Sequence, residues 1–207
     1  MVIFSGCPLN PGPPVIKEVR IWGKLEARDS VWFKCEMESF GKGGLKFVWS
    51  CLRGRFADSV ADSVKWFAPD SSGSTLIKVK VTDQQGGTAA DSLLIVVKPL
   101  TKSFINWDGA VKAGDFTFFF DSCWAGYRLR GNVSSDTGNV FLIFLDSLNF
   151  QKWHRGEQYQ YRIRQPAYRA SQFYDTIPVT GVYYLVLDNT RNFQDCSFQV
   201  NIQLTSP

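Results

Sequence analysis

Apolar and polar residues alternate along the first half of the chain with the period of two that is typical of strands buried on one face. One such stretch covers 45–51 and a second covers 76–83. A polar, glycine-containing turn leads from the second stretch into a third at 92–97. The pattern therefore predicts several short strands in this half.

The second half shows short β-branched and aromatic runs between turn residues. Turns are expected where glycine permits a positive φ, as at Gly114, Gly131 and Gly181. The expected strands are 115–120, 127–133, 140–145, 159–164, 182–187 and 197–204. No window of eleven or more residues holds the i, i+3, i+4, i+7 apolar stripe of a helix, so the whole chain is predicted to be all-β.

Composition and pattern together predict two consecutive β-sandwich domains. The chain has 207 residues, of which 44% are hydrophobic and 15% aromatic, and this is enough for two modest cores. A strand ending near Val97 is followed by Pro99 and a short polar stretch, as expected at a tight joint between domains. We expect a proline-rich tether at 1–14, one sandwich at 15–99 and a second at 103–207.

Charge excludes one class of partner. The formal net charge is +4, with 13 basic and 10 acidic residues before Leu100, and 10 basic and 9 acidic residues from there on. Neither half carries the basic block that is typical of nucleic-acid-binding domains. No nucleic-acid partner is expected.

The residues around Cys7 suggest a location. Residues 4–7 read Phe-Ser-Gly-Cys, and the four prolines of 8–14 fit a stiff tether because proline fixes φ and lacks a backbone donor. The Ser-Gly-Cys resembles the lipobox of bacterial lipoproteins, although Phe4 replaces the usual Leu and residues 1–4 are too short for a secretion signal. The resemblance implies a lipid on Cys7 and an extracytoplasmic, membrane-associated protein. The alternative is an ordinary tail with a chance Ser-Gly-Cys.

The other four cysteines divide evenly between the two predicted domains. Cys35 and Cys51 share the inward phase of their strands, so a disulfide between them is expected if the strands face each other. Cys123 ends an early strand of the second domain and Cys196 opens its last strand, and a second disulfide is expected there. The alternative is that all four are buried free thiols. Because the chain has one His and no Cys-x-x-Cys, no zinc site is expected.

The first domain resembles the immunoglobulin-like PKD domains of bacterial surface proteins. The resemblance lies in Trp49-Ser50, Gly54, the Val-x-Trp-x-Ala-Pro of 64–69 and the strand that ends at Asp83. It implies a β-sandwich that spaces, presents or adheres, without chemistry.

The second domain resembles the jelly-roll domains of the GOLD and bacterial pre-peptidase C-terminal types. The motifs are Ala113-Gly114 before an aromatic strand, and 177–189, where Gly-Val-Tyr-Tyr-Leu precedes an Asn-containing turn. The resemblance implies a recognition module without catalysis.

The segment 153–169 is rich in Arg and aromatic residues, and this composition suggests a role beyond building the fold. If 159–164 is a strand, its tyrosines point inward, whereas Arg162 and Arg164 point outward and form a row that could bind an acidic partner. The residues predicted to bind a partner are Trp153, His154, Arg155, Tyr159, Arg162, Arg164, Tyr168 and Arg169. The alternative is a solvated charged face.

No catalytic, cofactor or metal motif accompanies this segment. The chain lacks a nucleophile turn, a phosphate-binding loop and a dinucleotide fingerprint. We therefore expect a non-catalytic accessory subunit that docks on protein partners in a membrane-bound complex. The alternatives are a carbohydrate- or polymer-binding module that stacks aromatic residues on sugar rings, and a hydrolase that depends on His154.

Overall fold

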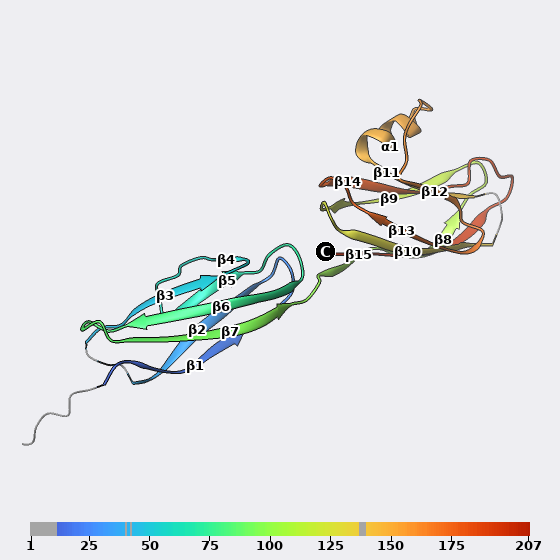
Figure 1. Ribbon diagram of the computed structural model, residues 1–207. Helices are drawn as coiled ribbons and strands as arrows, with labels where there is room; N and C mark the ends of the chain where they lie inside the picture. Colours follow the sequence, from blue (N-terminus) through green and yellow to red (C-terminus); the bar gives the residue numbers. More distant parts are fainter. Residues whose placement is uncertain (1–11, 40, 42, 137–139) are drawn as a thin grey trace, which may run out of the picture. The chain divides into compact units, whose positions relative to one another are not determined.

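The computed structural model describes residues 12–39, 41, 43–136 and 140–207, so Cys7 and its predicted lipid lie outside the described residues. The chain divides into two compact units, Met1–Pro99 and Leu100–Pro207 (Figure 1). The strands of each unit pair antiparallel into two sheets, which confirms the predicted all-β sandwich fold.

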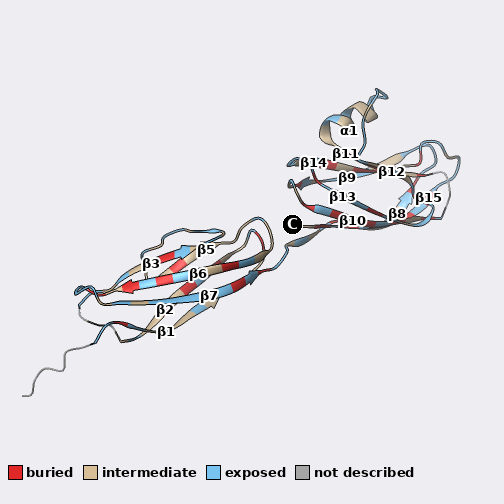
Figure 2. Cartoon of the chain, in the orientation of Figure 1, coloured by how far each residue is buried: buried red, intermediate tan, exposed pale blue. Residues whose placement is uncertain are grey.

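The described residues of the first unit form seven strands in two sheets, with the strand orders β1-β2-β5-β4 and β3-β6-β7. The strands are β1 Val15–Trp22, β2 Ser30–Ser39, β3 Lys46–Cys51, β4 Arg55–Phe56, β5 Ser63–Phe67, β6 Gly73–Thr82 and β7 Thr88–Val97. The expected alternation is present in β6, where Ile77, Val79 and Val81 are buried and Lys78 and Lys80 are exposed (Figure 2).

Aromatic residues join the two sheets of the first unit. The ring of Phe33 on β2 lies 6.1 Å from that of Trp49 on β3, and also 6.1 Å from that of Trp66 on β5. The indole of Trp49 donates a hydrogen bond to the carbonyl of Ala61 at 2.8 Å. Gly54 turns the chain above this cluster with φ +79°, a conformation that favours glycine. The core therefore depends on a few large rings.

In the second unit, residues 100–136 and 140–207 form eight strands in two four-stranded sheets, with the orders β13-β10-β15-β8 and β12-β11-β14-β9. The strands are β8 Thr101–Val111, β9 Phe116–Cys123, β10 Arg128–Ser135, β11 Phe141–Asp146, β12 Ile163–Pro166, β13 Arg169–Thr176, β14 Gly181–Asp188 and β15 Cys196–Thr205. The expected strand at 159–164 is wrong, because pairing with β11 begins only at Ile163.

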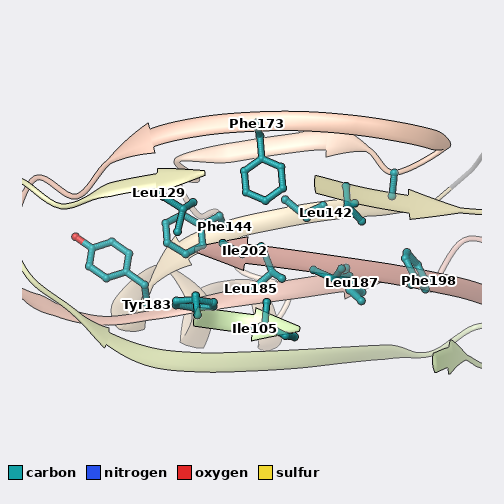
Figure 3. Packing of buried hydrophobic residues seen from close by; sticks show 14 of the residues in the cluster. Ile105, Leu129, Leu142, Phe144, Phe173, Tyr183, Leu185, Leu187, Phe198 and Ile202 are labelled. Atoms are coloured by element: carbon teal, nitrogen blue, oxygen red, sulfur yellow. The ribbon is translucent and has the colours of Figure 1, made fainter. Parts of the chain in front are cut away.

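The core of the second unit lies between its two sheets (Figure 3). Phe144 of β11 is fully buried, stacks on Tyr183 of β14 at 5.4 Å and meets Phe104 of β8 edge-on at 5.8 Å. Leu185 and Leu187 continue the same buried side of β14. Such rings and branched chains supply most of the burial free energy of a unit this size.

A short helix, α1 (Ser147–His154), follows β11 and was not predicted. Asp146 caps it by accepting a hydrogen bond from the backbone N–H of Asn149 at 2.9 Å. Eight residues are too few to fill the eleven-residue window on which the all-β prediction relied. The described residues contain no helix with the length and hydropathy needed to cross a bilayer.

Asn189 joins two loops at one end of the second unit. Its side chain is completely buried, and its Nδ2 lies 3.0 Å from each of the carbonyl oxygens of Val111, Lys112 and Gln194. Its Oδ1 accepts a hydrogen bond from Asn192 Nδ2 at 2.6 Å. Asn189 is the last residue of the motif on which the jelly-roll resemblance rests, and its buried amide gives that motif a physical role.

All four described cysteines are free thiols, which corrects the two expected disulfides. In the second unit, Lys102 Nζ bonds to the carbonyl of Ser122 at 2.8 Å, so Cys123 lies at the Lys102 end of the unit. Lys102 faces Leu204 in register, and Cys196 lies eight residues earlier on β15, which is about 26 Å away along a strand. A disulfide requires Cα atoms within about 7 Å.

A similar offset separates the cysteines of the first unit. Cys35 lines an open groove together with Phe47, whereas Cys51 lies four residues further along β3, about 13 Å away. The Cys51 thiol instead donates to the carbonyl of Gly54 at 3.6 Å, and the Cys35 thiol lies 3.7 Å from the sulfur of Met37. Both thiols point inward as expected, but they lie at different levels of the sandwich.

Candidate binding surfaces of the second unit

The outer face of the sheet β13-β10-β15-β8 carries carboxamide side chains on all four strands. Cross-strand register places Asn132 between Gln172 and Asn201, and Asn201 faces Asn106. Residues paired in this way point to the same side of a sheet, so these four form one row. Two glutamines of β15, two positions before and after Asn201, share its side. We define the amide face as Asn106, Asn132, Gln172, Gln199, Asn201 and Gln203.

Core packing fixes the outward direction of these amides. Along β15, buried and exposed residues alternate without interruption, and the buried set is Phe198, Val200, Ile202 and Leu204. A slip of one residue would bury the amides and expose this apolar set, so the register is strongly specified.

The amides of this face make few contacts with other protein groups. Nε2 of Gln199 lies 3.4 Å from a carboxylate oxygen of Asp108, and Nδ2 of Asn201 lies 3.4 Å from Oδ1 of Asn106. Both distances are long for hydrogen bonds. Within the described part of the chain, the side chain of Asn132 forms no hydrogen bond. Most donors and acceptors of the face are therefore available to a ligand.

Two shallow hollows mark this side of the unit. The first, of about 310 Å³, lies over the amide row and is lined by Asn106, Asp108, Asn132, Ser134, Gln199 and Asn201 among others. The second, of about 630 Å³, adjoins Arg128, Arg130 and Tyr174. The hydroxyl of Tyr174 donates to Gln172 at 3.1 Å, and the guanidinium of Arg130 lies 5.6 Å from the centre of the Tyr174 ring. Tyr174, with 62% of its surface exposed, forms an aromatic rim beside the amides.

Trp153 and His154, two of the predicted site residues, lie on α1 against the outer face of the opposite sheet. Trp153 is half-buried and meets Phe116 edge-on at 4.8 Å. The His154 ring lies 5.6 Å from that of Phe116 and 6.1 Å from that of Phe150. Among the described residues, no hydroxyl or thiol is hydrogen-bonded to His154, and no group of three or more His, Cys, Asp and Glu could hold a metal ion.

Other rings beside α1 are largely engaged with one another. Phe150 lies almost parallel to Tyr184, with ring centres 4.0 Å apart, and Phe118 meets Phe150 at 4.9 Å. Phe120, with 63% of its surface exposed, stacks on Tyr184 at 5.5 Å. Because these rings cover each other's faces, they stabilise the packing of α1 more than they offer free stacking surfaces.

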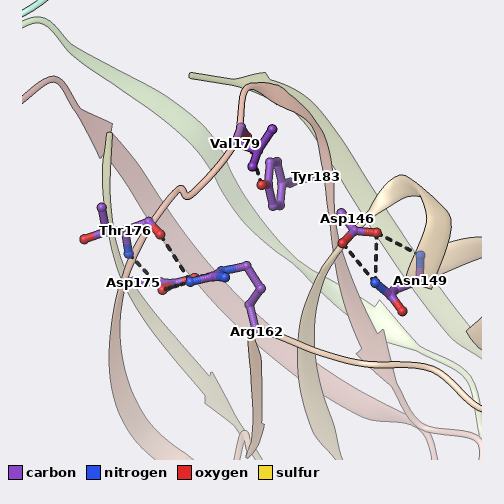
Figure 4. A network of polar contacts seen from close by, with 7 residues as sticks. All are labelled: Asp146, Asn149, Arg162, Asp175, Thr176, Val179 and Tyr183. Carbon is purple, nitrogen blue, oxygen red and sulfur yellow. Dashed lines mark hydrogen bonds and ion pairs between the residues drawn. The ribbon is translucent and has the colours of Figure 1, made fainter. Parts of the chain in front are cut away.

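The four predicted arginines do not form the expected outward row. Arg162 forms a bidentate ion pair with Asp175 of β13 and donates to the carbonyl of Thr176 at 3.2 Å (Figure 4). This carboxylate raises the pKa of Arg162. Arg169 opens β13, six residues before Asp175 and therefore about 20 Å away along the strand. The expected row assumed a strand at 159–164, which is absent.

The remaining arginines are also held separately. Arg164 lies on the outer side of β12, with its guanidinium 4.3 Å from the centre of the Phe141 ring. Arg155 follows α1 and pairs loosely with Glu157 at 3.8 Å. Each of the four predicted arginines therefore contacts a different partner.

The two predicted tyrosines have different environments. Tyr159 is half-buried and packs against the small cluster under α1. Tyr168 is exposed, and the guanidinium of Arg169 lies 5.1 Å from its ring centre. Of the two tyrosines of 159–164 that were predicted to point inward, Tyr159 does so, whereas Tyr161 is exposed.

Sequence reasoning missed the amide face. Its signal was present in β15, where Gln199, Asn201 and Gln203 alternate with apolar residues. The row across four strands could not be recognised, because it depends on the register of strands that are distant in the sequence.

No protein-family model matches the chain, and no curated protein matches it. The resemblances to PKD, GOLD and pre-peptidase domains therefore stay predictions.

Several solved structures are similar to the chain over most of its length. One is a carbohydrate-binding module of the β-sandwich superfamily, with 10% identity and a TM-score of 0.35, covering 96% of this chain and 93% of that one. Another is SGBP-B of the mixed-linkage glucan utilization locus of Bacteroides ovatus, solved with a mixed-linkage heptasaccharide, with 8% identity and a TM-score of 0.34, covering 88% of this chain and 49% of that one. A third is the secreted serine protease VesC from Vibrio cholerae, with 6% identity and a TM-score of 0.33, covering 89% of this chain and 50% of that one. At such identities and TM-scores the likeness does not assign a function.

Proposed function

We propose that the second unit is a non-catalytic module that binds a neutral polysaccharide across its amide face. The observation that carries the proposal is the row of Gln172, Asn132, Asn201 and Asn106, which lie in register on four neighbouring strands. A carboxamide offers both donors and an acceptor, as do the hydroxyl groups of a sugar. Three strand intervals make the row about 14 Å long, which suits an oligomeric ligand.

The composition of the face favours an uncharged ligand. Asp108 is the one acidic side chain that lines the hollow over the row, and the hollow contains no basic side chain. That hollow therefore offers no set of charges to match a charged polymer, and the nearest cation on this side of the sheet is Arg130, which faces Gln203 in register. Tyr174 at the rim could stack on the apolar side of a sugar ring.

A solvated sheet face needs polar residues but not amides in particular. In the first unit the exposed side of β6 carries Lys78 and Lys80. The same chain therefore builds ordinary solvent-facing sheets from charged residues. The concentration of Asn and Gln on one sheet of the second unit differs from this background and supports a binding role.

The proposal adopts the carbohydrate-binding alternative in preference to docking on a protein complex. The arginines predicted to bind an acidic partner lie in separate local contacts, and interface cores are usually richer in aromatic and apolar residues than the amide face. A polysaccharide ligand fits the expected extracytoplasmic location.

Affinity gel electrophoresis of the full chain tests the proposal, with mixed-linkage β-glucan, xylan, glucomannan and dextran as separate neutral probes. At least one probe should retard the protein. The double change Asn132→Ala and Asn201→Ala should weaken that binding at least about fivefold, because each lost net hydrogen bond costs about 0.5–1.5 kcal/mol. The change Gln158→Ala removes an exposed amide away from the sheet and should leave binding unchanged. Lack of retardation by all four probes, or an equal loss in the control, would contradict the proposal.

A further inference from the structure

A second exposed surface lies in the first unit, on the outer face of the sheet β1-β2-β5-β4. Trp22 and Trp32 face each other in register at one end of β1 and β2, and 47% and 48% of their surfaces are exposed. Residues paired in register share one side of a sheet, so the two indoles lie about one strand spacing, roughly 5 Å, apart at the backbone. Large apolar side chains of this kind are usually buried, and a pair left open on a sheet indicates a contact surface.

Cations surround this pair. Lys65 of β5 faces Trp32 in register, and Lys34 lies two residues from Trp32 on the same side of β2. Arg55 of β4 faces Phe67 in register, and its guanidinium lies 4.3 Å from the centre of that ring. We call Trp22, Trp32, Phe67, Lys34, Lys65 and Arg55 the tryptophan face.

The positive charge of this surface is not neutralised locally. Within the described residues, Lys34, Lys65 and Arg55 form no ion pair. Glu18 of β1 and Glu36 of β2 face each other in register on the same side of the sheet. Both carboxylates are bound by Arg20, at 2.6 and 3.1 Å. The tryptophan face therefore combines exposed rings with unpaired cations.

We propose that the tryptophan face binds an anionic polysaccharide. Sugar rings present an apolar side that can lie on indole, and the carboxylate or sulfate groups of an acidic polymer would pair with the lysines and the arginine. Three cations are fewer than the basic stripe expected of a nucleic-acid site. The site lies in the first unit and does not depend on the amide face.

Retention of the full chain on immobilised polygalacturonate tests this proposal, with the methyl-esterified polymer as the uncharged counterpart. We expect retention on the acidic polymer, at least tenfold weaker retention on the ester, and a steep loss of binding as salt is raised. The double changes Trp22→Ala with Trp32→Ala, and Lys34→Gln with Lys65→Gln, should each weaken retention at least tenfold. The lysine pair removes no buried side chain, although the Lys65 ammonium lies 5.5 Å from the centre of the Phe67 ring, so it keeps the test valid if the tryptophan pair impairs folding.

Matched controls come from the other sheet of the same unit. Lys78→Gln with Lys80→Gln removes two exposed lysines, and Leu94→Ala with Val96→Ala removes two exposed apolar side chains. Both controls should bind like the unchanged protein. Equal retention on the acidic and esterified polymers, equal loss in the controls, or binding to single-stranded DNA without binding to polygalacturonate would overturn the proposal. The Asn132→Ala and Asn201→Ala variant should bind polygalacturonate normally, which separates this site from the amide face.

Discussion

Replacing Asn189 should destabilise the second unit although the residue has no role in binding. Its amide has two protons for three carbonyl oxygens at 3.0 Å, so it supplies about two full donor bonds, and its oxygen accepts a third bond from Asn192. At about 1 kcal/mol net for each bond, the change Asn189→Ala should cost about 3 kcal/mol. The loss includes the cost of leaving buried carbonyl oxygens without donors.

The change Asn189→Asp provides a sharper test because it keeps the size of the side chain and removes its donors. At neutral pH it places a carboxylate against three carbonyl oxygens, so it should destabilise more than alanine. Burial would raise the pKa of that carboxyl in the folded state. Folding should therefore favour the protonated carboxyl. The loss of unfolding free energy in Asn189→Asp should become smaller as the pH falls towards the unfolded pKa of about 4.

Urea titration with cysteine labelling gives a readout for each unit. Cys123 and Cys196 report on the second unit, and Cys35 reports on the first. Asn189→Ala should lower the urea midpoint for the two thiols of the second unit and leave that of Cys35 unchanged. Asn201→Ala, which removes an exposed amide, is the matched control. An unchanged midpoint for Cys123 and Cys196, or a loss as large in the control, would refute the reasoning.

Three further predictions concern the thiols and one turn. Burial raises the pKa of Cys123 to about 12 and that of Cys35 to about 11, so iodoacetamide at pH 8 should label half-buried Cys51 before either of these two thiols, and peptide mass spectrometry should find none of the three oxidised. The folded pKa of Cys123 lies above its unfolded value near 9, so the protonated thiol contributes fully to stability below pH 9 and this contribution is lost as the pH rises towards 12. The urea midpoint of Cys123→Ala should therefore depend less on pH in that range than the midpoint of the unchanged protein. Gly54→Ala would place a Cβ 2.5 Å from the carbonyl oxygen of Phe67 at φ +79°, and should destabilise the first unit by about 2 kcal/mol in the same titration.

The strand content could be predicted from the sequence because inward and outward residues alternate with period two. In β6 and β15 this alternation is uninterrupted, and both strands occur where they were expected. The local pattern is sufficient there because each strand has one buried face and one solvent face.

Other features depend on contacts that a local pattern does not contain. Helix α1 exists because Asp146 caps it and because its rings pack on the sheet, and neither signal fills a periodic window. The disulfide predictions used the inward phase of the cysteines correctly, but phase does not determine position along a strand. Cys123 and Cys196 share a core and lie at opposite ends of it.

The candidate site also depends on contacts between residues that are distant in the sequence. The segment 153–169 was singled out by composition, but the structure uses Arg162 to bind Asp175 and Trp153 to pack α1. The amide face was missed because its four central residues come from four separate strands. Its recognition required the pairing of β10 with β13 and β15, which no short motif specifies.

The most direct test of the amide face is a side-chain amide NMR titration with an oligosaccharide of the neutral polymer that retards the protein. The NH₂ signals of Asn106, Asn132, Gln172 and Asn201 should shift together and saturate at one ligand concentration, while that of Gln158 stays in place. Shifts confined to Gln158 or to residues around α1, with the four row signals unmoved at saturation, would contradict the account.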